Sequence, residues 1–123
     1  MDVGERAILV VDDDPDIRAL LADALQDEGY AVTTAANGAE AIEVVDRTEP
    51  SLVLLDMRMP VLDGWGFARV LRERGVRLPI VVMTAAENAW RWCEEVGGDA
   101  CLPKPFDLGA LLETVERLSA PAA

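Results

Sequence analysis

The sequence contains no histidine, and this absence removes the most versatile ligand and base of protein sites. Without an imidazole, the usual zinc sites, histidine-ligated haem and Ser-His catalysis are excluded or severely weakened. The two cysteines, Cys93 and Cys101, lack the CxxC spacing of a zinc or redox motif. We therefore expect a chain that works in a reduced, cytoplasmic setting.

Long apolar runs and glycine-rich phosphate loops are missing too. No stretch of 18 apolar residues could span a membrane, and no signal peptide opens the chain. Neither GxGxxG nor GxxxxGK[ST] occurs, so Gly64 and Gly66 are interpreted as turn residues. We expect neither a membrane anchor nor a nucleotide-binding loop.

Positive charge is scarce. Eleven basic residues stand against 23 acidic ones, which leaves a net charge of −12. Such a potential repels nucleic acid and anionic membranes, so we expect no direct binding to either. The natural complement is a cation or a partner with a basic surface.

Short apolar runs alternate with segments of helical periodicity along the 123 residues. The runs are Ala7–Val11, Tyr30–Thr34, Ser51–Leu55, Pro79–Met83 and Asp99–Leu102. Helix starts are indicated at Asp14-Pro15, Asn37 and Asp107. This alternation predicts a parallel sheet with helices on both faces. Five strands are too few for an eight-stranded barrel, so we predict one domain with an open, doubly wound α/β fold, which is flavodoxin-like if its strand order is 2-1-3-4-5.

Acidic residues follow two of the predicted strands. Asp12 and Asp13 follow the first run, and Asp56 follows the third, whereas Asp14 is better interpreted as a helix cap. In open α/β sheets ligands bind beyond the carboxyl ends of the strands, where the strand order reverses. If the order is 2-1-3-4-5, these acids lie side by side there. Crowded carboxylates raise each other's pKa unless a cation joins them. A donor set of oxygen alone favours Mg²⁺, Mn²⁺ or Ca²⁺, and a small site shared with water and phosphate suits Mg²⁺ best.

Thr84 and Lys104 complete this edge of the sheet. Thr84 comes directly after the fourth run, and Lys104 follows the fifth between two prolines that fix its backbone. A carboxylate such as Asp56 can serve as the nucleophile for a phosphoryl group, whose oxygens the lysine would neutralise and the hydroxyl would hydrogen-bond. Plain alternatives are a helix cap for Thr84 and a surface role for Lys104.

Four segments together carry a family resemblance. They are Ile8–Ile17 (ILVVDDDPDI), Leu54–Pro60 followed by Asp63-Gly64, Val82–Ala85, and Leu102–Phe106. In this order, each at a predicted strand end, they resemble the receiver domain of bacterial two-component response regulators. The resemblance covers residues 7–118, so the whole chain, 1–123, is expected to be one receiver with its core at about 7–118.

The resemblance implies a role for each matching residue near the third strand. Asp56 would be the phosphoacceptor, Asp13 a direct Mg²⁺ ligand and Asp12 a ligand through water. The backbone carbonyl of Arg58 would complete the protein's share of the metal site.

It also implies roles for residues on the last two strands. Thr84 matches the switch hydroxyl, and Lys104 matches the lysine that contacts the phosphoryl group, with a cis bond to Pro105. The implied function is a non-enzymatic phosphoacceptor, loaded by a sensor histidine kinase or a histidine phosphotransfer protein, that signals to a downstream protein target. Self-association into a homodimer is left open.

Other functions fit less well. An unphosphorylated pseudo-receiver would typically lack part of the set Asp13, Asp56, Thr84 and Lys104. An aspartyl phosphatase would need a second acid two residues after Asp56, and a flavin carrier would need a Ser/Thr/Gly phosphate loop after the first strand.

Two departures from the family pattern concern signal output. Cys101 stands where an aromatic ring is usual, and the stretch from Thr84 to Lys104 is about two residues shorter than usual. We therefore expect the output to use the surface of the fourth helix, with Trp90 at least partly exposed on it.

Overall fold

The strands of the computed structural model, which describes residues 6–85 and 87–120, form one parallel sheet. They are β1 (Ala7–Val11), β2 (Ala31–Ala35), β3 (Leu52–Asp56), β4 (Ile80–Ala85) and β5 (Ala100–Lys104). Their order is β2-β1-β3-β4-β5, as predicted. The observed strands begin one residue later than predicted, except β1, and Lys104 is the last residue of β5, whereas the prediction placed it beyond the strand.

A helix follows each strand. The helices are α1 (Pro15–Asp27), α2 (Gly38–Thr48), α3 (Gly64–Glu73), α4 (Ala89–Val96) and α5 (Leu108–Ser119). The predicted caps at Asp14, Asn37 and Asp107 are confirmed, because each side chain accepts a hydrogen bond from a backbone N–H in the first turn.

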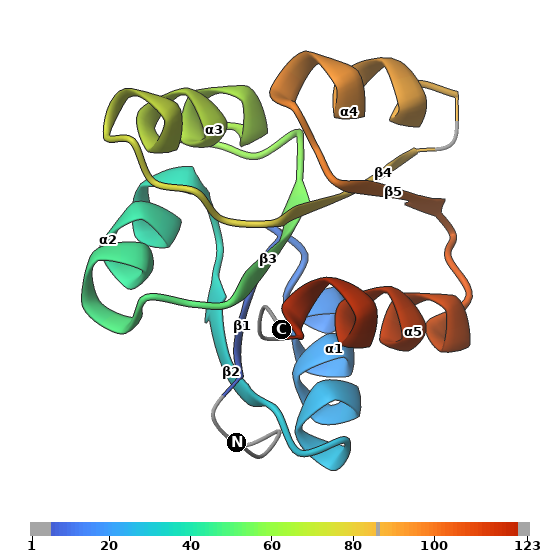
Figure 1. Ribbon diagram of the computed structural model, residues 1–123. Helices are drawn as coiled ribbons and strands as arrows, with labels where there is room; N and C mark the ends of the chain where they lie inside the picture. The colour runs from blue at the N-terminus through green and yellow to red at the C-terminus, as the bar shows by residue number, and fades with distance from the viewer. Residues whose placement is uncertain (1–5, 86, 121–123) are drawn as a thin grey trace.

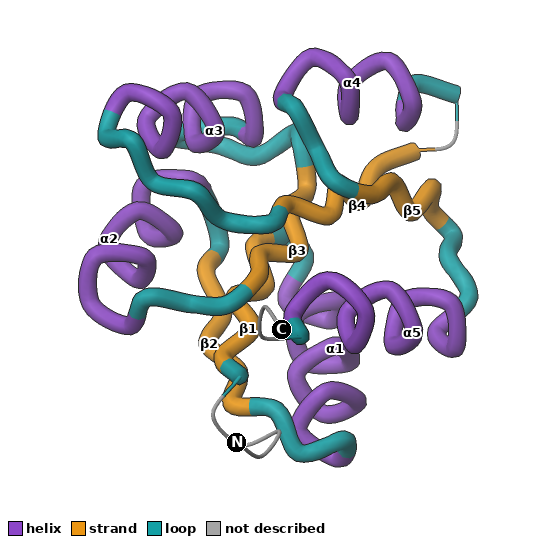
Figure 2. Tube along the Cα trace, viewed as in Figure 1, coloured by secondary structure: helices purple, strands orange, loops and turns teal. Residues whose placement is uncertain are grey.

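Two layers of helices cover the sheet (Figure 1). Helices α1 and α5 lie on one face, and α2, α3 and α4 lie on the other, as the tube in Figure 2 also shows. Alternate residues of a strand serve the two cores: Leu9 and Val11 of β1 face the larger helical layer, whereas Ile8 and Val10 face α1 and α5. Burial on both faces explains why β1 is apolar throughout, and why β3 and β4 are apolar up to Leu55 and Met83.

Membrane-spanning character was searched for among the same described residues. None of their helices is long and apolar enough to cross a bilayer. The prediction of a single domain over residues 1–123 includes both ends of the chain, which lie outside the described residues, and it stays a prediction.

Gly64 allows α3 to start close against the end of β3. Its N–H donates to the carbonyl oxygen of Met57 at 2.9 Å. A Cβ at this position would lie 2.9 Å from the backbone oxygen of Asp56 and 2.6 Å from the Met57 sulfur. A side chain here would therefore push the helix away from Asp56, the predicted phosphoacceptor.

We predict that Gly64→Ala destabilises the protein by about 1–3 kcal/mol, because it overpacks a closed contact with the backbone. Gly109→Ala in the first turn of α5 is the matched control, since its nearest neighbour would be 3.5 Å away. The control should be neutral or slightly stabilising. Urea unfolding of both variants measures the difference, and equal stabilities would contradict the close approach.

Candidate functional site

Buried polar side chains gather at one edge of the sheet. Four polar or charged side chains are buried within the described residues: Asp12, Asp56, Thr84 and Ser119. The first three lie at the carboxyl ends of β1, β3 and β4. Because an apolar environment penalises uncompensated polar groups, this concentration identifies the edge as a candidate site.

Three carboxylates meet there. Asp12, Asp13 and Asp56 each offer an oxygen, and these oxygens lie within 4.8 Å of one another. The sheet order causes the meeting, since β1 pairs directly with β3. The donors are oxygen only, so the cluster fits a hard divalent cation such as Mg²⁺.

Lys104 is the only lysine in the chain, and it reaches the same cluster. Its Nζ lies 2.8 Å from Oδ2 of Asp12 and 3.8 Å from Oδ1 of Asp56. The residues therefore combine as expected, but the closer ion pair is with Asp12 and not with Asp56. The expected cis bond between Lys104 and Pro105 is present.

The pKa of the Asp56 carboxyl is raised from its ordinary 3.8 to about 6. Burial is the largest cause, and the charge of Asp12 adds to it, with a smaller contribution from Asp13. The Lys104 ammonium and a hydrogen bond from the Met57 N–H lower the pKa in part. The site is thus electrostatically strained, with more negative charge than its single lysine balances.

The hydrogen bonds leave specific atoms available. Oδ1 of Asp56 accepts from the N–H of Met57 at 2.9 Å, whereas Oδ2 accepts no hydrogen bond from the described residues. Both oxygens of Asp12 are engaged, one by Lys104 and one by the N–H of Asp14 at 2.9 Å. Asp13 is exposed. The geometry therefore leaves one oxygen of Asp56 and the Asp13 carboxylate open to a ligand.

Thr84 stands on the strand next to Asp56. Asp56 pairs with Met83, the residue before Thr84, and the Thr84 side chain is buried. Its hydroxyl takes part in no hydrogen bond with the described residues. A hydroxyl with free capacity at this edge can donate to a group attached to Asp56.

Two contacts were not anticipated from the sequence. The Arg18 guanidinium donates to the carbonyl oxygen of Asp12 at 2.7 Å and so ties the end of β1 to α1. Arg58, whose carbonyl the family resemblance assigned to the metal, places its guanidinium over the ring of Trp92. No local pattern announces either contact, since both depend on how separate elements pack.

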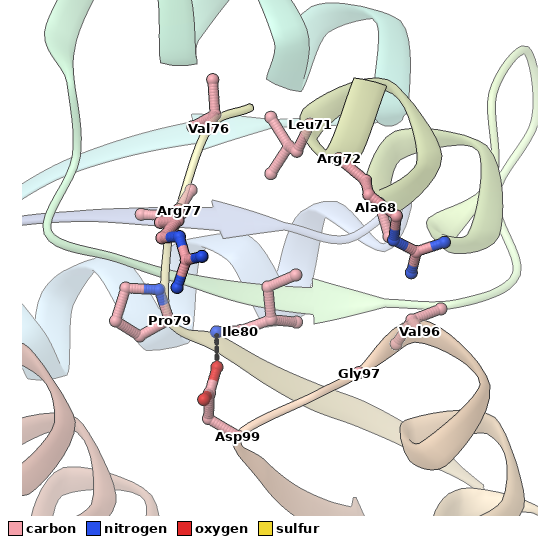
Figure 3. Close-up of a pocket in the computed structure, with 11 residues that line it drawn as sticks. Ala68, Leu71, Arg72, Val76, Arg77, Pro79, Ile80, Val96, Gly97 and Asp99 are labelled. Carbon is pink, nitrogen blue, oxygen red and sulfur yellow. Dashed lines mark hydrogen bonds between the residues drawn. The ribbon is translucent and has the colours of Figure 1, made fainter. Parts of the chain in front are cut away.

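A second hollow lies at the opposite edge of the sheet. It has a volume of about 440 Å³ and lies between α3, α4 and the start of β4, with Arg72 and Arg77 among its lining residues (Figure 3). Asp99 within it accepts a hydrogen bond from the N–H of Ile80 at 2.9 Å and so has a structural role. It shares no residue with the acidic cluster.

Comparison with known proteins gives a consistent result. Residues 8–116 match the family model described as the response regulator receiver domain. The sensor histidine kinase RcsC of Salmonella typhi is 44% identical over 111 residues, which are 88% of this chain and 12% of that protein. The response regulator MprA of Mycobacterium leprae is 42% identical over 113 residues, which are 90% of this chain and 50% of MprA.

A solved structure agrees. The response regulator TrrA of Thermotoga maritima, in complex with Mg²⁺ and BeF, aligns with a TM-score of 0.81 and 35% identity, covering 92% of this chain and 98% of TrrA. The present chain spans half or less of the two curated relatives, so their complete activities do not transfer to it. With a family model that covers nearly all of its described residues, the chain belongs to the receiver domain family of two-component response regulators.

Proposed function

We propose that the chain accepts a phosphoryl group on Asp56 from the phosphohistidine of a sensor histidine kinase or histidine phosphotransfer protein, with Mg²⁺ as cofactor. The observation that carries the proposal is the state of Asp56: a nearly buried carboxylate with one free oxygen, set between two acids and the only lysine. A nucleophile needs an open electron pair and a way to accommodate the charge that arrives with the phosphoryl group.

The transfer forms a bond between an Asp56 oxygen and phosphorus while the bond from phosphorus to the donor imidazole breaks. Oδ2 is the attacking atom in this proposal, because Oδ1 is held by the Met57 N–H. With a pKa of about 6, Asp56 is mostly ionised at neutral pH, so no base has to remove a proton. Lys104 then compensates the charge of the phosphoryl oxygens, and the Thr84 hydroxyl donates to one of them.

The metal would be held by Asp13 and Asp56 directly, by Asp12 through water and by the carbonyl of Arg58. The donor set supports this division, because Asp12 already serves Lys104 and the Asp14 N–H, whereas Asp13 is exposed. When bound, Mg²⁺ supplies charge neutralisation for phosphoryl oxygens. The Arg18 guanidinium donates a hydrogen bond to the carbonyl oxygen of Asp12 and so helps to hold the backbone of Asp12 and Asp13 in place.

We also propose that the signal passes to a protein partner in the cytoplasm, and that α4 forms part of the contact. The Trp90 side chain on α4 is 69% exposed, which confirms the expected exposure. Tryptophan is enriched among the residues that dominate binding energy at interfaces. The net charge of −12 favours a partner with a basic surface and disfavours nucleic acid.

The phosphoacceptor assignment predicts one labelled residue. Incubation with acetyl phosphate and Mg²⁺ should add about 80 Da to the intact mass, the mass of one phosphoryl group on a carboxylate. Asp56→Asn should abolish the gain with the fold intact, and either EDTA or Asp13→Ala should strongly reduce it. A parent protein that never gains this mass would instead support the alternative of an unphosphorylated interaction module, and labelled Asp56→Asn would move the acceptor elsewhere.

The raised pKa of Asp56 predicts a stability effect that depends on pH. Because the folded carboxyl binds its proton more tightly than the unfolded one, its ionisation destabilises the native state above about pH 6, and this cost vanishes toward pH 4. The pKa difference corresponds to a cost on the order of 3 kcal/mol at neutral pH.

In EDTA, Asp56→Asn should therefore be more stable than the parent at pH 7.5, and the gain should shrink as the pH falls through this window. Urea unfolding at several pH values measures it, with Asp23→Asn on the exposed face of α1 as the control that should change little. A gain in the Asp56 variant that does not vary with pH would contradict the electrostatic account.

The output surface predicts a separation of binding from phosphorylation. Trp90→Ala should weaken association with a partner, or self-association, while leaving acetyl phosphate labelling unchanged, because the side chain is exposed and not part of the acidic cluster. Leu20→Ala is the matched control, because Leu20 is also an exposed apolar side chain but lies on α1 and not on α4. Sedimentation with and without phosphorylation measures self-association, and pull-down with the cognate kinase measures partner binding.

A further inference from the structure

Helix α4 makes three side-chain contacts with Arg58, which follows β3, and with Trp65 of α3. The Arg58 guanidinium carbon lies 4.9 Å from the ring centroid of Trp92, within the range of a cation–π interaction. Trp92 also packs edge-to-face against Trp65, with centroids 5.0 Å apart and an interplanar angle of 70°. Trp65 in turn donates from Nε1 to Glu95 of α4 at 2.8 Å.

The backbone between Asp56 and these contacts is short and held at both ends. Only Met57 separates Asp56 from Arg58. The Met57 N–H donates to the Asp56 carboxylate, and its carbonyl accepts from Gly64 at the start of α3. A change in the charge or position of the Asp56 carboxylate therefore acts on a backbone segment that is fixed by hydrogen bonds. Arg58, whose side chain contacts α4, lies only two residues from Asp56.

Helix α4 is well suited to respond. It is the shortest of the five described helices, with eight residues. Its N-cap residue, Asn88, makes no side-chain hydrogen bond to the backbone of the first turn and instead accepts one from Arg91 at 3.1 Å. A short helix whose N-cap side chain does not bond its first turn depends on tertiary contacts, so a small change in them can shift it.

The β5 side of α4 offers a weaker alternative. Cys101 of β5 packs against the same apolar cluster as Trp92 and Cys93, and it is a small side chain with no ring. The large contacts of Trp92 are thus directed toward Arg58 and Trp65, on the side of β3 and α3.

We propose that Arg58 is a positioning residue that links the Asp56 site to α4 through its contact with Trp92. The link rests on the proposed function, because the change it would transmit to the helix is the phosphorylation of Asp56 with its bound metal. Coupling of this kind is a free energy shared by two sites, so it requires that both act on the same movable element, here α4.

The test compares two arginine variants of equal charge. Arg58→Met keeps the backbone carbonyl and removes the guanidinium, whereas Arg69→Met removes an exposed arginine of α3 from the same helical layer. Beryllofluoride with Mg²⁺ serves as the probe, and its binding is followed by the rise in melting temperature. The response is read from the amide resonances of residues 93–96, which lie beyond Trp92 itself.

In the parent and in Arg69→Met, the probe should shift the amides of residues 93–96. At a probe concentration that saturates each variant, as judged by its melting temperature, Arg58→Met should lose most of that shift. Trp92→Phe should lose part of it, with Trp90→Phe as its exposed control.

Three results would overturn the link. An equal shift in Arg58→Met and Arg69→Met would remove Arg58 from the route. A parent that binds the probe with no shift in residues 93–96 would refute coupling to α4 and leave the phosphoacceptor proposal standing. A parent that neither binds the probe nor gains the phosphoryl mass would refute both.

Discussion

Repulsion among three carboxylates, balanced by a single lysine, is the constraint on which the site depends. Carboxylate oxygens of Asp12, Asp13 and Asp56 lie within 4.8 Å of one another, and Lys104 is the only lysine in the chain. The balance is incomplete, as the raised pKa of Asp56 shows. Because these acids repel one another, the stability of the native state depends on the charge at the site. A bound cation or a phosphoryl group changes that charge and therefore changes the stability.

The rest of the structure keeps these groups in place against their repulsion. The pairing of β1 with β3 brings the acids together, and burial of both strands on two faces prevents them from separating. Arg18 bonds the carbonyl at the end of β1, and the close start of α3 at Gly64 fixes the backbone after Asp56. Because these contacts hold the carboxylates in fixed positions, a change of charge at Asp56 cannot be relieved by moving the carboxylates apart. It acts instead on a neighbouring element that is held less firmly.

That weaker element is α4. It is short, its first turn lacks a side-chain cap to the backbone among the described residues, and its main aromatic side chain contacts Arg58 and Trp65. The same helix carries the exposed Trp90. Trp92 faces the core and Trp90 faces solvent, so one helix joins a contact directed toward the site with a surface suited to a partner.

The sequence by itself determined the alternation of strands and helices, because this depends on local periodicity and on caps. The strand order and the candidate set Asp12, Asp13, Asp56, Thr84 and Lys104 followed from the family resemblance together with the rule that parallel strand ends share an edge. Periodicity also separated buried Trp92 from exposed Trp90. Only the tertiary structure decided that Lys104 pairs more closely with Asp12 than with Asp56, and that Arg58 reaches Trp92. Long side chains choose among partners that lie far away in sequence, and that choice depends on ångström-scale packing that no local pattern encodes.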